Sequence, residues 1–385
     1  MPSSGLGEIR KALMGYRALV TGGAGFIGSH LTDELLHQGH SVRVLDSLCS
    51  QVHGPNSSRP AYLSTEAELQ VGDIRNRDAV AAALEGIDVV YHLAAAVGVG
   101  QSMYEIDHYV DVNTRGTAIL LEEMLKSKAQ RLVVASSMSI YGEGLYQGAD
   151  GSIVQGGLRK MQQLVDHEWE LRDERGRPLR PLPTPETKTP QLASIYAMTK
   201  YDQERMCLIF GQTYRIPVVA LRFFNTHGPR QALSNPYTGV LAIFAARLMN
   251  DKPVTIFEDG LQQRDFVSVH DVARACCLAG RLPQANGLAI NIGSGRPCTI
   301  RQIAADIAAV LGKQDIQAEI AQQYRAGDIR HCYADVTLAE DVLGYRPQVG
   351  LDAGLRELAQ WLSSQVAADN SALAREELDK RGLAV

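Results

Sequence analysis

The sequence lacks several features that define special classes of protein. No run among its 385 residues approaches the roughly 18 apolar residues that a membrane span requires. Residues 1–15 lack the apolar core of a secretory signal. The net charge of -5 provides no positive field for a nucleic acid or an acidic membrane surface. We therefore expect a cytoplasmic protein whose partners are neither nucleic acids nor membranes.

The cysteines are few and lack the pattern of a metal site or a disulfide framework. None of the six forms a Cys-x-x-Cys pair or has the histidine spacing typical of zinc. We expect no metal, and we expect reduced, mostly buried thiols. The six residues are Cys49, Cys207, Cys276, Cys277, Cys298 and Cys332.

The composition that remains is typical of an ordinary α/β protein. Hydrophobic residues make up 45% of the chain and charged residues 21%, and there are 35 glycines. A chain of 385 residues is long for one compact unit. We therefore expect either one domain with a large insertion or two intimately joined lobes.

A glycine-rich turn near the start of the sequence has the pattern of a dinucleotide-binding loop. It follows a predicted strand at 16–21 and opens a predicted helix, with glycines at Gly22, Gly25 and Gly28. Such glycines permit a tight turn and close approach of the backbone to a pyrophosphate, which the helix N-terminus then binds. The next predicted strand ends at Asp46, which suits a ribose diol and would repel a 2′-phosphate. We therefore predict NAD rather than NADP as the cofactor.

Two further segments have features of a cofactor site. Asp73 follows a third predicted strand and can accept from the adenine amino group while Ile74 packs on the ring. Asp73 can equally cap the helix that begins near Arg77. Residues 89–95 form a buried parallel strand that runs into small residues, so a dinucleotide can lie against its backbone. We interpret His92, within this strand, as a structural histidine.

Hydroxyl groups gather where the next predicted strand ends. Residues 131–135 form this strand, and Ser136, Ser137 and Ser139 follow it directly. Ligands of an open α/β sheet lie beyond the carboxyl ends of its strands. These serines are therefore candidates for a binding site.

The segment from Ser194 to Lys200 contains the most distinctive pair of residues. On a helix, Tyr196 and Lys200 share one face, so the lysine ammonium can lie near the phenol and favour the phenolate. A phenolate is a usable base near neutral pH. A surface helix also makes such pairs by chance, so their meaning depends on the surrounding motifs.

In this order, the motifs resemble those of the extended short-chain dehydrogenase/reductase family, and more narrowly of its nucleotide-sugar epimerases. The resemblance covers residues 16–365. It implies an α/β fold: a Rossmann-type doubly wound parallel sheet with a smaller mixed α/β C-terminal substrate-binding lobe. The implied divisions are an NAD-binding Rossmann domain at 16–215 with an insertion at about 143–190, the remaining Rossmann strands and interleaved lobe at 216–365, and a tail at 366–385.

The resemblance also assigns roles in catalysis and cofactor binding. Tyr196 would take the proton from the C4 hydroxyl of a sugar, with Lys200 beside it and Ser137 bonded to the same oxygen, while NAD accepts the C4 hydride. The 4-keto sugar would turn over and regain the hydride on its other face. The implied cofactor residues are Gly22, Gly25, Phe26, Ile27, Gly28, Asp46, Asp73, Ile74, Leu93, Ala94, Ala95, Asn113, Ser136, Tyr196 and Lys200.

Substrate binding is implied mainly by the second half of the chain. Asn225, Arg264 and Arg325 match residues that contact the substrate diphosphate in the family, so a dTDP- or UDP-linked sugar is the expected partner. Cys332 stands where a residue gates the sugar pocket by size. Ser137 and Tyr196 are the main candidates at the sugar oxygen, and Ser136 and Ser139 are secondary ones.

The resemblance extends to the type of reaction and to the sugar. Family dehydratases carry an Asp-Glu pair directly after the catalytic hydroxyl, where this chain has Met138 and Ser139, so epimerisation is expected. Residues 137–144, the end of the insertion and the tail at 381–383 resemble dTDP-L-rhamnose 4-epimerases, whose product is dTDP-6-deoxy-L-talose. UDP-glucose and UDP-N-acetylglucosamine 4-epimerases are alternatives, and a non-catalytic dinucleotide sensor is a more remote one.

The insertion and two helices carry the remaining expectations. The insertion is expected to contain a helical stretch at 158–171 and a proline-stiffened segment, forming either a lid or wall of the sugar pocket or a surface excursion without a role. The helices at 103–126 and 193–214 each carry an apolar stripe. In the family such helices pair into a four-helix bundle, so we expect a homodimer.

Overall fold

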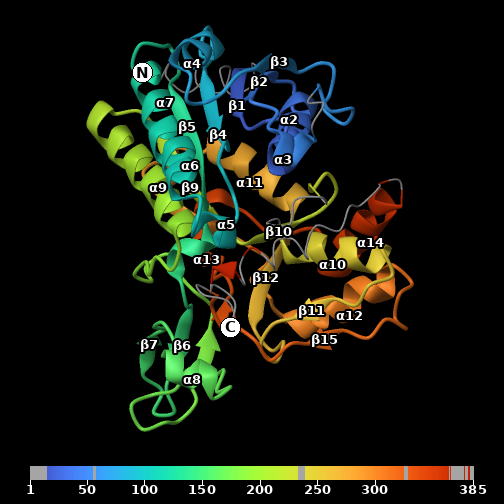
Figure 1. Cartoon of the computed structure of the whole chain (residues 1–385). Coiled ribbons are helices and arrows are strands. Elements are labelled where there is room, and N and C mark those ends of the chain that lie inside the picture. The colour runs from blue at the N-terminus through green and yellow to red at the C-terminus, as the bar shows by residue number, and fades with distance from the viewer. Residues whose placement is uncertain are drawn as a thin grey trace.

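The computed structural model describes residues 15–54, 58–232, 239–324, 328–363, 365, 377 and 380–381. Its centre is a seven-stranded, all-parallel sheet in the order β13-β9-β5-β4-β1-β2-β3, with helices on both faces (Figure 1). The predicted Rossmann-type fold is thereby confirmed. The strands are β1 (Arg17–Thr21), β2 (Ser41–Asp46), β3 (Glu68–Val71), β4 (Val89–His92), β5 (Arg131–Ser137), β9 (Val218–Phe223) and β13 (Ala289–Ile292).

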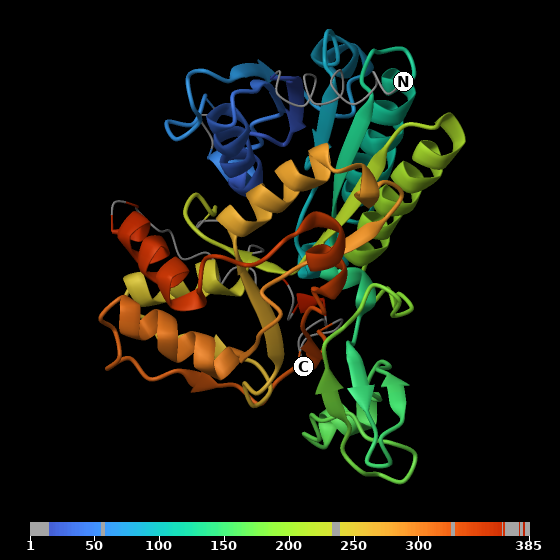
Figure 2. The same cartoon turned by 180° about the vertical axis from the view of Figure 1, so that it is seen from behind.

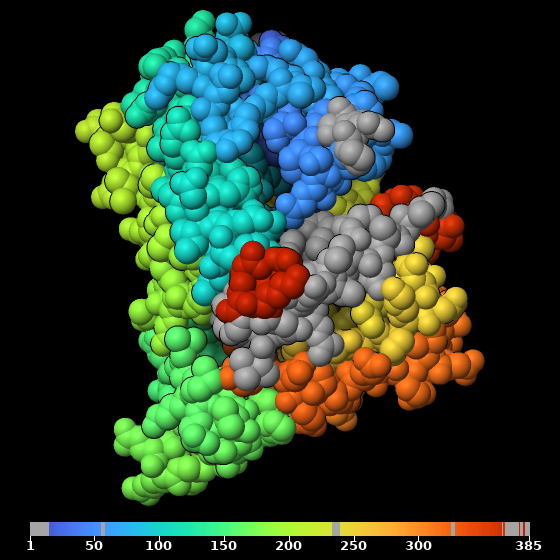
Figure 3. Space-filling view, viewed as in Figure 1, coloured from blue at the N-terminus to red at the C-terminus, as the bar shows by residue number. Residues whose placement is uncertain are grey.

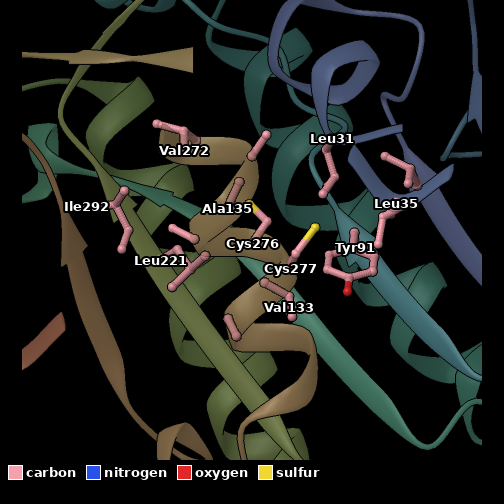
Figure 4. Close-up of a cluster of buried hydrophobic side chains, with 14 of the residues drawn as sticks. Leu31, Leu35, Tyr91, Val133, Ala135, Leu221, Val272, Cys276, Cys277 and Ile292 are labelled. Carbon is pink, nitrogen blue, oxygen red and sulfur yellow. The ribbon is translucent and has the colours of Figure 1, made fainter. Parts of the chain in front are cut away.

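Alternating side chains on these strands divide the sheet into two buried faces. On β5, Val133 packs with one hydrophobic cluster, whereas its neighbours Leu132 and Val134 pack with the other. The first face is covered by α2 (Phe26–His37) and α11 (Val269–Arg281), whose side chains meet the sheet in Figure 4. The second face is covered by α4 (Arg77–Ala83), α7 (Gly116–Met124) and α9 (Ile195–Tyr214).

The remaining helical elements of this layer are short. The predicted helix at 103–126 is divided, because a π-helical segment separates α6 from α7. The short elements are α3 (Ser50–His53), α5 (Val99–Ser102), α6 (Ile106–Tyr109), the π-helix η1 (Val110–Arg115), and the 3₁₀ helices η2 (Met138–Tyr141) and η3 (Pro283–Ala285). A further helix, α13 (Thr337–Leu343), packs beside β13.

A smaller mixed lobe interleaves with the sheet in sequence, because its first elements lie between β9 and β13. A separate hydrophobic cluster, which includes Leu241, Ile307 and Leu358, holds three helices of the lobe together. The lobe lies beside the carboxyl ends of the strands (Figures 1 and 2). Its elements are β10 (Asn225–His227), α10 (Val240–Met249), β11 (Thr255–Ile256), β12 (Gln263–Ser268), β14 (Pro297–Thr299), α12 (Ile300–Val310), β15 (Glu319–Ile320), β16 (His331–Cys332) and α14 (Leu351–Leu362).

The insertion forms a small antiparallel sheet that projects from the body of the molecule (Figure 2). Its strands are β6 (Leu145–Gln147), β7 (Ile153–Gln155) and β8 (Arg180–Leu182), in the order β7-β6-β8. The helix expected at 158–171 is confined to α8 (Met161–Val165). The chain after α8 instead turns back toward β8, with a bridge between Arg172 and Pro178.

All six cysteines are free thiols, as expected. Four are buried, whereas Cys298 is half-buried and Cys49 is exposed. Within the described ranges, no helix combines the length and apolarity that crossing a bilayer would demand.

Candidate active site

The glycine turn and the start of α2 form a backbone cradle. Gly22 has φ of +70°, and a Cβ placed on it would lie 2.8 Å from the backbone nitrogen of Ala94. A Cβ on Gly28 would lie 2.1 Å from the carbonyl oxygen of Gly22. Gly25 is the N-cap of α2 and provides no side chain, so the first-turn amides, which include Phe26 and Ile27, keep a positive helix terminus open to an anion. This arrangement fits a pyrophosphate.

Replacing Gly28 with alanine is expected to reduce the affinity for NAD by at least about tenfold, because the new methyl group would collide with backbone atoms of the cradle. Titration calorimetry with NAD measures this loss. Gly157→Ala is the matched control, since a Cβ there meets nothing within 4 Å and the residue needs no positive φ. Equal affinities in the two variants would contradict the assignment of this cradle.

Asp46 lies next to the cradle at the end of β2. Its Oδ2 accepts from the amide of Ala24 at 3.0 Å, and its Oδ1 accepts from the amide of Leu48 at 2.9 Å. The imidazole Nε2 of His53 is 3.7 Å from Oδ1. The two amides fix the carboxylate, which keeps further lone pairs for ribose hydroxyls. Asp46 thus suits the diol of NAD, as the sequence predicts.

The structure excludes one of the two roles predicted for Asp73, that of capping the helix. Asn76 caps α4 by accepting from the amide of Ala79, so Asp73 is not the cap. Asp73 instead accepts from the guanidinium of Arg75, and this contact lowers the pKa of its carboxyl. Ile74 is buried in the second face of the sheet. The adenine role of both residues stays a prediction.

The loop after β4 runs beside the glycine turn, with Leu93 and Ala94 in contact with it, and the predicted NAD contact of Ala95 stays a prediction. Asn113, on the π-helix, is buried and supports this loop: its Oδ1 accepts from the amide of Ala96 at 2.7 Å, and its Nδ2 donates to the carbonyl of Ala96 at 3.0 Å. The same Nδ2 donates to the hydroxyl of Thr199 on α9 at 3.0 Å. Asn113 therefore ties the loop to α9, and its predicted contact with NAD would be indirect.

The helix α9 begins at the carboxyl edge of the sheet and presents Tyr196 there. Ser194 caps it by accepting from the amide of Ala197 at 3.1 Å, and Ser102 accepts from the amide of Tyr196 at 3.0 Å. Burial raises the pKa of Tyr196, and a side-chain hydrogen bond with Ser137 acts in the opposite direction. The structure therefore brings the two predicted catalytic hydroxyls together.

Ser137 stands at the junction between β5 and η2. Its Oγ accepts from the amide of Ser139 at 3.2 Å and also lies within hydrogen-bonding distance of the hydroxyl of Ser139. The two hydroxyls thus form a pair at the edge of the sheet. Ser137 lies beside Tyr196 and Ser139 beside Ser137, and the substrate roles of both serines stay predictions.

Lys200 makes a different contact from the one expected. Its ammonium donates to the Oε1 of Gln203 at 2.7 Å, and the Nε2 of Gln203 donates to the hydroxyl of Thr117 at 2.8 Å and lies 3.2 Å from His92. Burial lowers the pKa of Lys200 to about 8. The expected lowering of the Tyr196 pKa by Lys200 is not found in this structure, because the ammonium is turned toward Gln203.

Sequence reasoning missed Gln203 and Ser102. Gln203 lies three residues after Lys200, so the helical spacing that identified the Tyr196 and Lys200 pair also places Gln203 near the ammonium. Ser102 is 94 residues from its partner Tyr196, and no local pattern could have found it.

Ser136, a predicted cofactor residue, uses its hydroxyl in a buried hydrogen bond to Glu204. Its hydroxyl donates to the Oε2 of Glu204 at 2.7 Å, and Glu204 accepts two further bonds from Arg222, at 2.7 and 2.9 Å. Arg222 also donates to the phenol of Tyr141 at 2.8 Å. These buried groups satisfy one another, so Ser136 contributes to a structural network behind the site.

Two of the three residues predicted to contact the diphosphate lie on strands of the C-terminal lobe, β10 and β12. Asn225 starts β10, and its buried Oδ1 has no partner among the described residues, as a ligand-binding amide would before its ligand arrives. The guanidinium of Arg264 donates to the carbonyls of Gln263, Ile329 and Arg330. Arg325 lies outside the described residues.

Cys332, the residue predicted to gate the sugar pocket by size, is buried. It is 1% exposed, and its thiol contacts the hydroxyl of Thr184 in the insertion at 3.7 Å. Burial raises the pKa of this thiol to about 12. Its predicted role in selecting the sugar stays untested, but in this structure the insertion covers it.

Comparisons with known proteins agree with this geometry. The NAD dependent epimerase/dehydratase family matches residues 18–157 and 175–293. A dTDP-L-rhamnose 4-epimerase from Burkholderia thailandensis is 36% identical over 362 residues, which cover 92% of this chain and 97% of that protein.

Solved structures show the same similarity. A UDP-glucose 4-epimerase from Thermotoga maritima with UDP-glucose has a TM-score of 0.74 and 30% identity, covering 90% of this chain and 98% of that one. A UDP-glucose 4-epimerase from Thermus thermophilus in complex with NAD has a TM-score of 0.69 and 29% identity, covering 91% and 100%. The predicted family and cofactor are confirmed: the chain belongs to the NAD dependent epimerase/dehydratase family and is an NAD-dependent nucleotide-sugar 4-epimerase.

Proposed function

We propose that this 4-epimerase interconverts dTDP-L-rhamnose and dTDP-6-deoxy-L-talose. The observation that carries the proposal is its 36% identity to the dTDP-L-rhamnose 4-epimerase over nearly the whole of both chains. The residues after Ser137 support the reaction type, because Met138 and Ser139 provide no carboxylic acid that could expel a hydroxyl from the sugar.

The side chains at the sheet edge carry the proton chemistry. Tyr196 takes the proton from the C4 hydroxyl of the sugar and later returns it, so it acts first as base and then as acid. Ser137 donates to the same sugar oxygen and holds it at Tyr196. Bound NAD supplies the group that accepts a hydride and gives it back.

Two polar groups of the lobe would bind the nucleotide end. The guanidinium of Arg264 and the Nδ2 of Asn225 are donors that suit the oxygens of a diphosphate, and the unpartnered Oδ1 of Asn225 can accept from a ligand hydroxyl or amide. Arg325 is proposed as a third group on sequence grounds. An anchor at the diphosphate leaves the sugar able to turn over between the two half-reactions.

A panel of nucleotide sugars tests the substrate. We expect dTDP-L-rhamnose and dTDP-6-deoxy-L-talose each to be converted to a mixture of the two, with no net accumulation of NADH. NMR of the anomeric protons identifies the product, and absorbance at the NADH band checks the redox balance. Conversion of UDP-sugars alone would contradict the proposed substrate, and steady NADH formation would contradict epimerisation.

UDP-glucose or UDP-N-acetylglucosamine is the second candidate substrate. It is favoured by the similarity to the Thermotoga maritima enzyme, whose structure contains UDP-glucose. The same panel separates the candidates, because both UDP-sugars are included in it. A protein that binds NAD and converts no member of the panel would instead be a dinucleotide sensor.

We also propose a cytoplasmic homodimer with the domain divisions given above. The six free thiols suit a reducing compartment. Ile106 and Ile209, on α6 and α9, are 49% and 54% exposed, and apolar side chains on these helices would be covered in a four-helix bundle between two copies. Light scattering at micromolar concentration measures the mass directly.

A further inference from the structure

The insertion is joined to the C-terminal lobe along two backbone segments. The amide of Gly144 donates to the carbonyl of His331 at 2.8 Å, and the amide of Thr184 donates to the carbonyl of Tyr333 at 2.8 Å. Thr184 also forms a parallel bridge with Ala334. The space-filling view shows the insertion in contact with the lobe (Figure 3). The insertion is therefore seated on the segment that follows the predicted substrate residue Arg325.

Arg330 stands at the centre of this contact and is fully buried, with 0% of its surface exposed. Its Nε donates to Glu170 of the insertion at 3.0 Å. Its Nη1 donates to Glu258 at 2.9 Å and to Asp259 at 2.7 Å, both in the lobe, and its Nη2 donates to Asp259 at 2.9 Å. The guanidinium of Arg330 thus binds carboxylates of the insertion and of the C-terminal lobe at once.

A second arginine and two more groups surround Arg330. Arg159 of the insertion donates to the Oε1 of Glu258 at 2.7 Å, and Glu143 accepts from the backbone amide of Arg330 at 2.6 Å. The Nδ1 of His331 accepts from a backbone amide, so its Nε2 carries the ring proton and donates to Glu170 at 3.0 Å. We call Glu143, Arg159, Glu170, Glu258, Asp259 and Arg330 the ionic cluster.

The ionic cluster adjoins the predicted diphosphate site through the backbone of Arg330. Arg264 donates from Nη1 to the carbonyl of Arg330 at 2.9 Å and from Nη2 to the carbonyl of Ile329 at 2.6 Å. Because the side chain of Arg330 is fixed on both sides, these carbonyls are fixed as well. They determine where the guanidinium of Arg264 lies.

We propose that Arg330 is a positioning residue, which fastens the insertion to the lobe as a fixed wall and holds Arg264 in place for a nucleoside diphosphate. The inference rests on the proposed function, since Arg264 is assigned to the diphosphate only there. The buried guanidinium of Arg330 is suited to this role, because removing a carboxylate partner such as Glu170 leaves two of its N–H groups without their acceptor and disturbs its neighbours. The insertion is then part of the binding site rather than a surface excursion.

Glu170→Gln tests the inference, with Glu168→Gln as its matched control two residues away. Glu168 pairs with Arg172 at the surface, where both side chains are more than 40% exposed, so its loss is expected to have no effect. Glu170→Gln removes one charge from the fork of Arg330. We expect its affinity for the sugar-free nucleotides dTDP and UDP, measured by calorimetry, to fall by about tenfold. Its affinity for NAD is expected to be unchanged.

Two further measurements distinguish positioning from a general loss of structure. In turnover of the preferred nucleotide sugar, Glu170→Gln is expected to raise KM by about tenfold and to leave kcat within about threefold. Trypsin is expected to cleave the insertion faster in Glu170→Gln than in Glu168→Gln. Arg330→Lys, which keeps the charge without the planar fork, should weaken nucleotide binding in the same direction.

The results distinguish a failure of this inference from a failure of the proposed function. Equal dTDP and UDP affinities in Glu170→Gln and Glu168→Gln would overturn the inference, as would a wild-type chain that binds neither nucleotide. Nucleotide binding that weakens in Glu170→Gln, in a chain that converts no sugar of the panel, would support the inference and count against the proposed function alone.

Discussion

Replacing Tyr196 with phenylalanine is expected to lower kcat by about 10³-fold, because the phenol is the group proposed to remove and return the proton of the sugar hydroxyl. The ring would still fill its place beside Tyr109, so folding and NAD binding should be retained. Turnover is measured by NMR of the sugar, and NAD binding by calorimetry. The loss should appear in kcat and in kcat/KM alike, since the proton transfer occurs only in the transition state.

Tyr201→Phe is the control for this experiment, because Tyr201 lies on the same helix, is half-buried and has no proposed part in the chemistry. It should keep kcat within about threefold of the wild type. A Tyr196→Phe enzyme with near-normal turnover would remove Tyr196 from the mechanism. Ser137 would then be the remaining hydroxyl at the sugar oxygen.

Acidification is expected to destabilise the fold steeply, because three histidines are buried in the neutral form. Burial lowers the pKa of His30 and His92 to about 3 and that of His227 to about 4. Below pH 6.5 the unfolded chain protonates these side chains and the folded chain does not, so stability falls as the pH falls. Each histidine contributes about 1.4 kcal/mol per pH unit in this window.

The three together would cost about 4 kcal/mol for each pH unit below 6. Urea unfolding at several pH values between 7.5 and 5 measures this slope. Burial raises the pKa of Asp265, so this carboxyl acts in the opposite direction to the histidines as the pH falls through its pKa. A free energy of unfolding that stays constant over this range would contradict the neutral, buried state of these rings.

His227→Leu isolates one of the three histidines. Neither ring nitrogen of His227 has a hydrogen-bond partner among the described residues, so leucine loses no such bond there. The variant should have a slope lower by about 1.4 kcal/mol per pH unit. His108→Leu is the control, since His108 is exposed. Identical slopes in both variants would show that His227 is not a source of the acid sensitivity.

Much of the cofactor side could be predicted from the sequence because its signals are local. The glycines of the turn, Asp46 at a strand end and the tyrosine on its helix are each specified by a few neighbouring residues. The near-continuous apolar runs of the strands, such as the one that begins at Val89, likewise predict a parallel sheet buried on both faces. These features follow from backbone geometry that any chain must obey.

The contacts that local sequence could not reveal are long-range ones. Ser136 bonds to Glu204, 68 residues away, and Glu170 bonds to Arg330, 160 residues away. By helical spacing, the ammonium of Lys200 can reach either Tyr196 or Gln203. The packing of the folded protein, which local sequence does not show, selects Gln203. The small sheet of the insertion was missed because its three-residue strands are too short to show a period.

Because the two lobes interleave in sequence, the chain cannot be truncated between them without breaking the central sheet. A chain that stopped at residue 215 would contain neither β9 nor β13, so its sheet would end at β5, a strand that pairs with β9 in the whole protein. That edge carries Leu132, Val133 and Val134, and an apolar unpaired strand invites aggregation. The nascent chain completes its sheet only after residue 292 is made, when much of the substrate lobe has already been synthesised. The cofactor-binding sheet and the substrate lobe therefore have to be expressed together, as one chain.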